Sequence, residues 1–325
     1  MTAGELVRKN NLSGQPVVVV SGRQKRPNVK NVSNDGCPFC PGGLEAPEEY
    51  EVHWFKNRWP PLPDGRCEVI LFSPDHHASL GSLEIDHLEM VVDLWTERTE
   101  ELGSRPDVKY VLIFENRGAD VGATIPHPHG QIYAFDSIPP APAYELGLPP
   151  CEICSQLADV FPGGGGENRL VVEEGSWAAW SVWAPAYPFE LLVAPREHLG
   201  SLSEAKGSRR DLAFVLQSAL GALDGLFDEP MPYMLWCHQK PTDSNSWPAA
   251  HLHFHVAPIR RAKGVTRYVA AGELGSGIMF NPVDPEDAAA QLRDALAKLR
   301  RAPTGPSYPS IGTEQPATSY LGYSR

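Results

Sequence analysis

The sequence lacks any apolar run near the roughly 20 residues that a membrane-spanning helix needs. Its first residues, up to Arg8, also lack the apolar core of a signal peptide. Basic residues are few, since 28 Lys and Arg stand against 40 Asp and Glu and give a net charge of −12. A general nucleic-acid binder needs a basic face, so this balance argues against one. We expect a cytoplasmic protein with neither a nucleic acid nor a membrane as its partner.

The remaining composition is ordinary for a globular chain of 325 residues, with 42% hydrophobic and 21% charged residues. The 32 Pro and 29 Gly predict many turns and long ordered loops. A small phosphorylated substrate stays compatible with the acidic balance, because a few Arg side chains and backbone N–H groups suffice to hold it.

Cysteine is scarce, and four of the six cysteines form two Cys-x-x-Cys pairs, Cys37/Cys40 and Cys151/Cys154. In a cytoplasmic chain such pairs indicate metal ligands or redox pairs before disulfides. Neither pair is expected to open a helix after a strand, as a thioredoxin-type motif does, which favours metal. Cys67 and Cys237 are single, lie in apolar runs and are expected to be buried.

An internal repeat organises the chain. Each half has a Cys pair, a strand-like run, a His after Pro, a helix-like stretch, a second strand and a His-x-His motif. The strand-like runs lie at 67–72 and 108–114 in the first half and at 189–194 and 233–237 in the second, and the helix-like stretches lie near 85–102 and 203–227. Two copies of the same ordered pattern indicate a duplication.

A Pro-rich connection over 138–150 separates the halves. We predict an N-terminal repeat over 1–145, a C-terminal repeat over 146–301 and an extended or disordered tail over 302–325. Strands that alternate with single long helices favour an α+β fold, with an antiparallel sheet and helices packed on it. The two repeats are expected to pair into one pseudo-symmetric unit.

The repeat assembles two candidate zinc sites, because zinc favours four thiolate and imidazole ligands. The first set is Cys37, Cys40, His76 and His127, and the second is Cys151, Cys154, His198 and His251. Four such ligands leave no open position, so both would be structural sites. The alternative is reduced Cys pairs without metal. His77, beside His76, is expected at the surface or next to the site.

The segment 125–131 contains the candidate nucleophile. If it is a strand, His127, His129 and Gln131 project to the same side. A neutral imidazole attacks phosphorus when its other nitrogen is held by a hydrogen bond, and Gln131 can donate to a phosphoryl oxygen. The preceding Gly-bearing loop offers backbone N–H groups with Asn116, Gly122 and Thr124 for phosphates. The alternative makes His129 an ordinary polar residue of an edge strand beside a turn.

These residues resemble the galactose-1-phosphate uridylyltransferases of the histidine triad superfamily. The resemblance implies that the two tandem repeats are histidine-triad-like. The resemblance rests on the Arg segment 23–27, Cys37-Pro-Phe-Cys40, Asn57-Arg-Trp-Pro60, Ser73-Pro-Asp-His76 and Phe114 to Gln131, whose His-Pro-His-Gly-Gln motif is the most specific. It implies a ping-pong nucleotidyl transfer through His129, with Gln131 as phosphoryl donor and His127 as a zinc ligand whose carbonyl orients His129.

The resemblance also assigns binding residues and partners. It implies nucleotide contacts by Arg23, Arg26, Asn57, Asn116, Gly122 and Thr124, and hexose contacts by Arg267, Tyr268 and Glu273. The substrates would be a nucleotide sugar and a sugar 1-phosphate. Family members are usually homodimers whose sites form between subunits.

The second half departs from that pattern. Glu145, His238, His253 and His255 match positions that hold iron or zinc in some family members. The second Cys and His set instead resembles ADP-glucose phosphorylase-like relatives, as does the Gly-Ser-Gly segment at 275–277. His253 also resembles the nucleophile of small nucleotide hydrolases.

Three functions therefore compete. The first exchanges hexose 1-phosphates on a uridine nucleotide, the second is an ADP-sugar phosphorylase that uses phosphate as acceptor, and the third is a non-catalytic nucleotide binder. The intact His127, His129 and Gln131 set favours an enzyme.

Overall fold

The computed structural model describes residues 7–21, 23, 36–148 and 150–301. Arg26 and the predicted tail over 302–325 lie outside the described residues. Its strands are β1 (Val7–Lys9), β2 (Pro16–Val18), β3 (His53–Lys56), β4 (Cys67–Leu71), β5 (Tyr110–Arg117), β6 (His129–Phe135), β7 (Leu170–Glu174), β8 (Trp177–Ser181), β9 (Leu191–Pro195), β10 (Tyr233–His238), β11 (His253–Pro258), β12 (Arg260–Ala262) and β13 (Val265–Thr266).

The helices are α2 (Ile85–Gly103), α3 (Pro140–Leu146), α4 (Glu152–Val160), α5 (Arg209–Gly225), α6 (Ala271–Ser276) and α7 (Pro285–Arg301). Short 3₁₀ helices include η3 (Ala119–Val121), η4 (Glu167–Arg169) and η5 (Lys206–Ser208). The two long helices predicted near 85–102 and 203–227 are α2 and α5.

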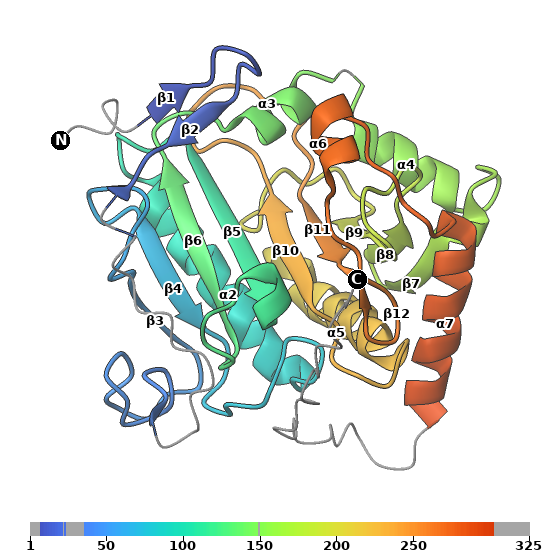
Figure 1. Ribbon diagram of the computed structural model, residues 1–325, viewed down its shortest axis with the longest axis horizontal. Coiled ribbons are helices and arrows are strands. Elements are labelled where there is room, and N and C mark those ends of the chain that lie inside the picture. Colours follow the sequence, from blue (N-terminus) through green and yellow to red (C-terminus); the bar gives the residue numbers. More distant parts are fainter. Residues whose placement is uncertain (1–6, 22, 24–35, 149, 302–325) are drawn as a thin grey trace, which may run out of the picture.

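One nine-stranded sheet spans both halves of the chain, in the order β3-β4-β6-β5-β10-β11-β9-β8-β7, and every printed pairing in it is antiparallel. β5 and β10 form the central pair, and outward from it β6, β4 and β3 match β11, β9 and β8 (Figure 1). Phe114 of β5 lies opposite Trp236 of β10 at the centre of this arrangement. The predicted α+β class and the pairing of two repeats are confirmed.

Helices α2 and α5 cover one face of the sheet, behind it in Figure 1. In α2 the buried residues Leu88, Val92 and Trp95 recur at helical spacing. The two helices pack against each other, and a Cβ at Gly81, before α2, would approach the α5 backbone at Gly221 to 3.0 Å. The main hydrophobic core lies between these helices and both halves of the sheet.

The opposite face carries a smaller apolar cluster in each half. In the first half Phe39, between Cys37 and Cys40, packs with Val69 and Leu71 of β4. In the second half Ile153, between Cys151 and Cys154, packs in a cluster with Leu192 and Ala194 of β9. Each Cys pair is thereby held against the same face of the sheet by the apolar residue inside its own motif.

A buried ion pair joins α2 to the outer strands. Arg98 donates two hydrogen bonds of 2.9 Å to the Glu68 carboxylate, and both side chains are almost fully buried. The Arg98 guanidinium also lies 3.5 Å from the ring centre of Trp54. Because removal of one partner leaves a buried charge alone, this pair ties the helix layer to β3 and β4.

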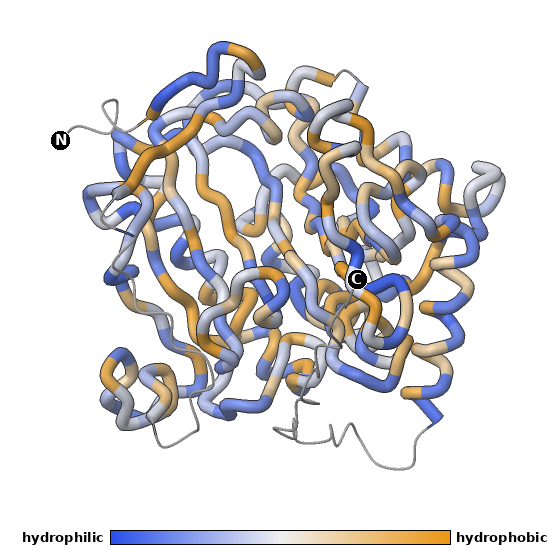
Figure 2. The backbone as a smooth tube through the Cα atoms, in the orientation of Figure 1, coloured by the Kyte–Doolittle hydropathy of each residue, from blue (hydrophilic) through white to orange (hydrophobic). Residues whose placement is uncertain are grey.

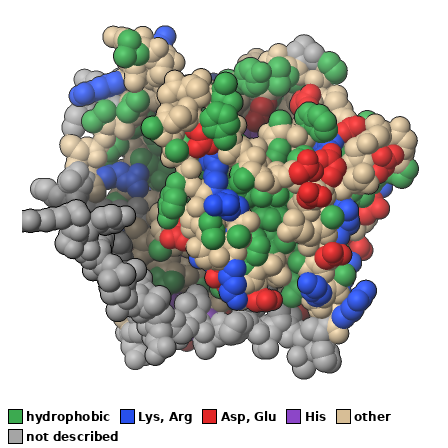
Figure 3. All heavy atoms as spheres, turned by 45° about the vertical axis from the view of Figure 1, so that its right-hand side comes forward, with side chains coloured by type: hydrophobic (Ala, Val, Ile, Leu, Met, Phe, Trp, Pro, Cys, Tyr) green, Lys and Arg blue, Asp and Glu red, His purple; other side chains and the backbone are tan. Residues whose placement is uncertain are grey.

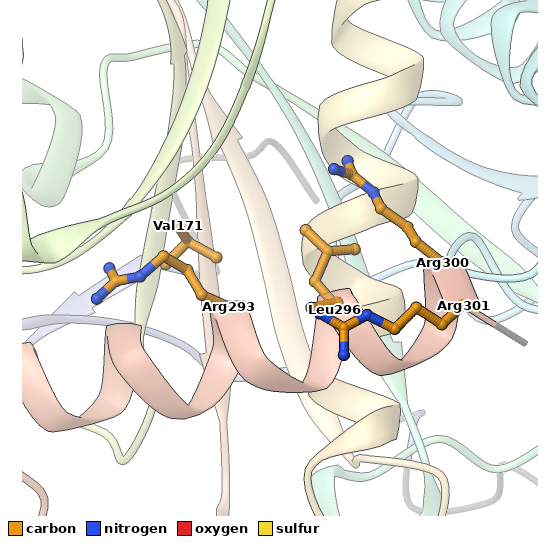
Figure 4. Close-up of a pocket in the computed structure, with 6 residues that line it drawn as sticks. Val171, Arg293, Leu296, Arg300 and Arg301 are labelled. Atoms are coloured by element: carbon orange, nitrogen blue, oxygen red, sulfur yellow. The ribbon is translucent and has the colours of Figure 1, made fainter.

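Helix α7 closes the outer edge of the second half. Its hydropathy alternates along the helix in Figure 2, and it buries Ala288, Leu292 and Leu296. Arg293 donates hydrogen bonds of 2.7 and 2.6 Å to the carbonyls of Asn168 and Leu170, and the shallow hollow beside it is lined by Val171, Leu296 and Arg300 (Figure 4). We interpret this hollow as the line along which α7 packs against its neighbours. No helix among the described residues is long and apolar enough to cross a membrane.

The buried carboxyl of Glu115 yields a prediction about stability. Burial raises its pKa to about 7, although the Tyr233 hydroxyl, 2.9 Å away, and Arg117 act to lower it. Because this folded-state pKa exceeds the unfolded value, the folded protein binds more protons between the two, and stability falls as pH rises through that window.

We expect Glu115→Gln to reduce the loss of folding stability with rising pH, by roughly 2–3 kcal/mol between about pH 5 and about pH 7. Urea unfolding at several pH values measures it, with the exposed Glu174→Gln as the matched control. An unchanged slope in Glu115→Gln contradicts the prediction.

Candidate active site and metal centres

The first predicted metal set is assembled. The ligand atoms of Cys37, Cys40, His76 and His127 all lie within 4.8 Å of one another. The Cys40 Sγ is 3.4 Å from His76 Nδ1 and 3.5 Å from His127 Nδ1. Burial raises the pKa of Cys40 to about 12 and lowers that of His127 to about 4, so without a cation these two donors are neutral. Neutral thiols and imidazoles packed this closely are the donor set that zinc binds as thiolate and imidazole.

The tautomer of His127 supports a metal ion. Its Nε2 lies 2.8 Å from the Ser73 carbonyl oxygen, which only accepts, so Nε2 carries the hydrogen and the Nδ1 lone pair faces Cys40. The Tyr50 hydroxyl lies 2.9 Å from the same Nε2 and donates to the Phe39 carbonyl oxygen at 2.7 Å. Tyr50 therefore braces the Cys loop against His127, a role that no sequence pattern indicated.

The second predicted set has the same geometry. Cys154 Sγ lies 3.2 Å from His198 Nδ1 and 3.3 Å from His251 Nδ1. The Nε2 of His251 lies 2.8 Å from the Pro195 carbonyl, as that of His127 does from Ser73. Cys151 caps α4, which follows α3 and not a strand, so the arrangement is not of the thioredoxin type.

The imidazole of His129 is held by a hydrogen bond to the backbone of His127, two residues earlier. Its Nδ1 lies 2.8 Å from the His127 carbonyl oxygen, which fixes the hydrogen on Nδ1 and leaves the lone pair on Nε2. The Phe39 ring packs edge-on against the imidazole at 5.1 Å. Gly130 is required here, because a Cβ would come within 2.7 Å of the Phe72 ring.

One detail of the predicted strand is wrong. β6 begins at His129 and β11 at His253, so His127 and His251 lie before the strands and do not share their alternation. Pro128 has no N–H for a ladder hydrogen bond, and the His127 side chain is drawn into the Cys cluster. His129 and Gln131 do share one face of β6.

Gln131 is oriented by two neighbours. Its Oε1 accepts a hydrogen bond of 3.1 Å from the Asn57 amide and one of 3.2 Å from the Tyr133 hydroxyl. With Oε1 engaged, the amide N–H groups are the part of Gln131 left to meet a substrate oxygen. Asn57, predicted as a nucleotide contact, touches Gln131 in the structure. Tyr133 was missed, although its position two residues along β6 placed it on the same face.

The predicted phosphate loop follows β5. Gly118 and Gly122 have φ values of 97° and 91°, a conformation that favours glycine, and they flank the 3₁₀ turn Ala119–Val121. Asn116 and Thr124 are half-buried at the two ends of the loop. Arg23 lies close enough to Cys67, which is opposite Tyr133, to act on the pKa of that thiol. Arg26 lies outside the described residues.

The predicted hexose residues are placed in the second half. Arg267 and Glu273 form a buried ion pair, and the Arg267 guanidinium lies 4.9 Å from the ring centre of Tyr187. Glu273 also accepts hydrogen bonds of 2.8 and 3.0 Å from the backbone N–H groups of Ala270 and Phe280. These contacts shape the segment 267–280. Tyr268 is 72% exposed.

A third cluster lies where the second half departs from the family pattern. Glu145 of α3 lies 2.7 Å from His238 Nδ1, 3.5 Å from His253 Nε2 and 3.7 Å from His255 Nε2. Burial alone would raise the pKa of Glu145, but these imidazoles hold it well below its usual range. The Nδ1 of His253 lies 2.7 Å from the His251 carbonyl, so its Nε2 lone pair faces the His255 Nε2 at 3.1 Å. Three imidazole nitrogens and a carboxylate converging in this way fit a cation.

This geometry bears on His253 as a second nucleophile. The side chain is 5% exposed and its Nε2 is directed at Glu145 and His255. Its hydrogen bond to the preceding carbonyl matches that of His129, but its reactive nitrogen belongs to the third cluster. His77 is exposed beside the first metal set, as expected.

Comparison with known proteins agrees with this arrangement. The chain matches the family model described as galactose-1-phosphate uridyl transferase, N-terminal domain, over residues 56–139, and the corresponding C-terminal domain over 165–301. A galactose-1-phosphate uridylyltransferase of Thermotoga maritima is 35% identical over 324 residues, which cover 90% of this chain and 99% of that protein.

Solved structures show the same fold. A uridylyltransferase structure, 26% identical, superposes with a TM-score of 0.78 over 90% of this chain and 98% of that one. An ADP-glucose phosphorylase of Arabidopsis thaliana, 22% identical, gives 0.68 over 89% and 98%. The fold and site define a duplicated α+β protein with a histidine held over a Cys and His metal set. The chain belongs to the galactose-1-phosphate uridylyltransferase family.

The two Cys sets predict unequal effects on catalysis. Cys40→Ser and Cys154→Ser should each lower the content of bound metal by one ion per chain. Only Cys40→Ser disturbs His127, whose carbonyl holds His129, so we expect it to lower kcat at least about tenfold and Cys154→Ser to lower it far less. Metal analysis and steady-state kinetics measure both variants, and equal losses of kcat would contradict this coupling.

The contact between Asn57 and Gln131 predicts a kinetic signature. Asn57→Ala leaves Gln131 free to turn its amide, so kcat should fall roughly tenfold while the KM for the nucleotide sugar changes little. A change confined to KM would instead support the direct nucleotide contact that the family resemblance implies.

Proposed function

We propose that the protein exchanges hexose 1-phosphates on a nucleoside diphosphate sugar of the UDP-glucose type, through a covalent nucleotidyl-His129. The observation that carries the proposal is the 2.8 Å hydrogen bond from His129 Nδ1 to the His127 carbonyl, which leaves Nε2 as the nucleophile. Family membership supports the substrate class, because the Thermotoga maritima relative is named for galactose 1-phosphate.

In the first half-reaction the His129 Nε2 lone pair attacks the α-phosphorus of the nucleotide sugar. A bond forms between Nε2 and phosphorus as the bond to the bridging oxygen breaks, and hexose 1-phosphate leaves with that electron pair. The imidazole becomes positively charged, and the His127 carbonyl stabilises it through the Nδ1–H. In the second half-reaction a phosphate oxygen of another hexose 1-phosphate attacks the same phosphorus and releases His129.

The surrounding residues stabilise the charge that develops. The Gln131 amide donates to a non-bridging oxygen, with Asn57 and Tyr133 as the groups that orient it. The loop that begins at Gly118 supplies backbone N–H groups for the phosphates, and Asn116 and Thr124 contribute side-chain donors. We assign Arg23 and Arg26 to the nucleotide on the family resemblance.

Zinc is the metal that suits both Cys and His sets, and when bound it supplies structural constraint and no open position for substrate. Cys37, Cys40, His76 and His127 would hold the first ion, and Cys151, Cys154, His198 and His251 the second. The first set fixes the residue whose carbonyl orients the nucleophile. The second set fixes the equivalent residue of the other repeat.

We also propose a homodimer in which the segment 267–280 contributes to the hexose site. Its apolar residues Tyr268, Leu274, Ile278 and Phe280 are between 60% and 77% exposed, which is unusual for side chains of this size. One face of the molecule in Figure 3 shows apolar side chains among charged ones. Tyr268 is the candidate hexose contact, while Arg267 and Glu273 shape the segment.

A phosphorylase remains the second candidate, because the second Cys and His set resembles phosphorylase-like relatives. Both functions share the nucleotidyl-His129 and differ only in the acceptor that resolves it. The nucleotidyl-protein, isolated and then mixed with either hexose 1-phosphate or inorganic phosphate, distinguishes them. Release of a nucleotide sugar with the first and not of a nucleoside diphosphate with the second supports the uridylyltransferase.

Intact-mass analysis tests the nucleophile. Mixing the protein with UDP-glucose should add one uridylyl group per chain, and peptide mapping should place it on His129. His129→Ala should show no adduct and lose at least about 10⁴-fold in exchange of label between UDP-glucose and glucose 1-phosphate. The exposed His77→Ala is the matched control and keeps the adduct. An adduct on His253, or one that survives in His129→Ala, would sink the proposal.

A further inference from the structure

The phosphate loop of the first repeat, residues 118–124, is supported by residues of the second repeat. Gly118 has a φ of 97°, and a Cβ there would approach the Cβ of Pro232, just before β10, to 3.0 Å. Arg117, at the end of β5, pairs at 2.6 Å with the buried Asp224 of α5, which also accepts the Met231 N–H at 2.7 Å. The connection between α5 and β10 therefore sets the position of the loop.

The same connection holds the start of the hexose segment, residues 267–280. The Pro232 carbonyl accepts the Ile259 N–H at 3.1 Å, and the Ile259 carbonyl accepts the Arg267 N–H at 2.6 Å. Between these two residues the chain forms the hairpin of β12 and β13. Two binding segments that are far apart in the sequence thus share one support.

Arg260 of β12 forms the charged contact between this hairpin and the phosphate loop. Its guanidinium lies 2.5 Å from the Glu229 carboxylate and 3.7 Å from the Asp120 carboxylate. Glu229 also accepts the Gly264 N–H at 2.9 Å, so the turn of the hairpin and Arg260 are held by the same carboxylate. Asp120 lies in η3, between the two glycines of the loop that have positive φ.

Asp120 requires a counter-charge if the loop is to receive phosphates. A carboxylate repels the negative charges of a nucleotide diphosphate, and this carboxylate is part of the loop itself. Its side chain is 42% exposed, and ion pairs at such exposure contribute little to folding stability. The consequence of the pair with Arg260 is therefore the charge that it cancels.

We propose that Arg260 is a positioning residue that couples the phosphate loop to the hexose segment. It neutralises Asp120, so that the loop accepts phosphates, and nucleotide binding in turn stabilises the hairpin from which the hexose segment begins. The inference rests on the proposed function, because it takes the nucleotide phosphates to bind at this loop. No sequence pattern indicated a role for Asp120 or Arg260.

Equilibrium binding of UDP and of ADP to the full-length protein with its metal retained tests the neutralisation, since the two nucleotides share the diphosphate and differ in the base. Arg260→Gln should weaken the tighter of the two roughly fivefold, and less in about 1 M salt. The double variant Arg260→Gln with Asp120→Asn should return to within about twofold of the unmodified protein, a rescue that a merely structural role would not give. The exposed Arg261→Gln is the matched control and keeps the affinity.

Hydrogen exchange at saturating nucleotide tests the coupling. Binding should slow the exchange of backbone amides over 264–270 in the unmodified protein and in Arg261→Gln. The same nucleotide should leave this exchange unchanged in Arg260→Gln and in the double variant, although the double variant binds it well.

The proposal is overturned if neither nucleotide binds, if Arg260→Gln binds as tightly as Arg261→Gln, or if Asp120→Asn fails to restore binding, since Arg260 would then contact phosphate directly. It is equally overturned if exchange over 264–270 responds to nucleotide in the same way with and without Arg260. These measurements need no turnover. Failure of the proposed function is seen separately, as the absence of a uridylyl adduct on His129 in the unmodified protein.

Discussion

The hydrogen bond from His129 Nδ1 to the His127 carbonyl is the interaction on which the chemistry of the molecule depends. It selects the tautomer of the proposed nucleophile, and it sets the direction of the Nε2 lone pair. The carbonyl can do this only because His127 is itself held, by its Nδ1 near Cys40 and its Nε2 at Ser73. The first Cys and His set thus positions one backbone oxygen. The sheet and the helices packed on it hold the residues that form this set.

The same hydrogen-bonded arrangement occurs in both repeats, but the residues around it differ. Both repeats hold a histidine by the carbonyl of a Cys-set histidine, at 2.8 Å for His129 and 2.7 Å for His253. In the first repeat the neighbours are Gln131 and Asn116, which suit a phosphoryl group. In the second repeat they are His255 and His238, joined by Glu145, which suit a cation. Two side-chain differences and one carboxylate from α3 separate the proposed nucleophile from a candidate metal ligand.

Much of the site could be predicted from the sequence because the same pattern of residues occurs in both repeats, and each copy supports the interpretation of the other. Each Cys pair and its two histidines recur in the same order, and the alternation of β6 placed Gln131 beside His129. The boundaries between the repeats remain a prediction, since one sheet and one main core span both halves. Tyr50 and Phe39 could not be assigned, because their contacts with His127 and His129 depend on how a loop folds onto the sheet. The strand starts at His129 and His253 depend on tertiary contacts of the residues before them.

The most direct measurement of the central claim is the tautomer of His129, observed by nitrogen-15 NMR of the imidazole in the full-length protein, with His129→Gln used for assignment. The account predicts a neutral ring with its hydrogen on Nδ1 and an unprotonated Nε2. It also predicts that this preference weakens in Cys40→Ser, where His127 loses its anchor, and persists in Cys154→Ser. A ring with its hydrogen on Nε2, or a preference indifferent to Cys40, would contradict the account.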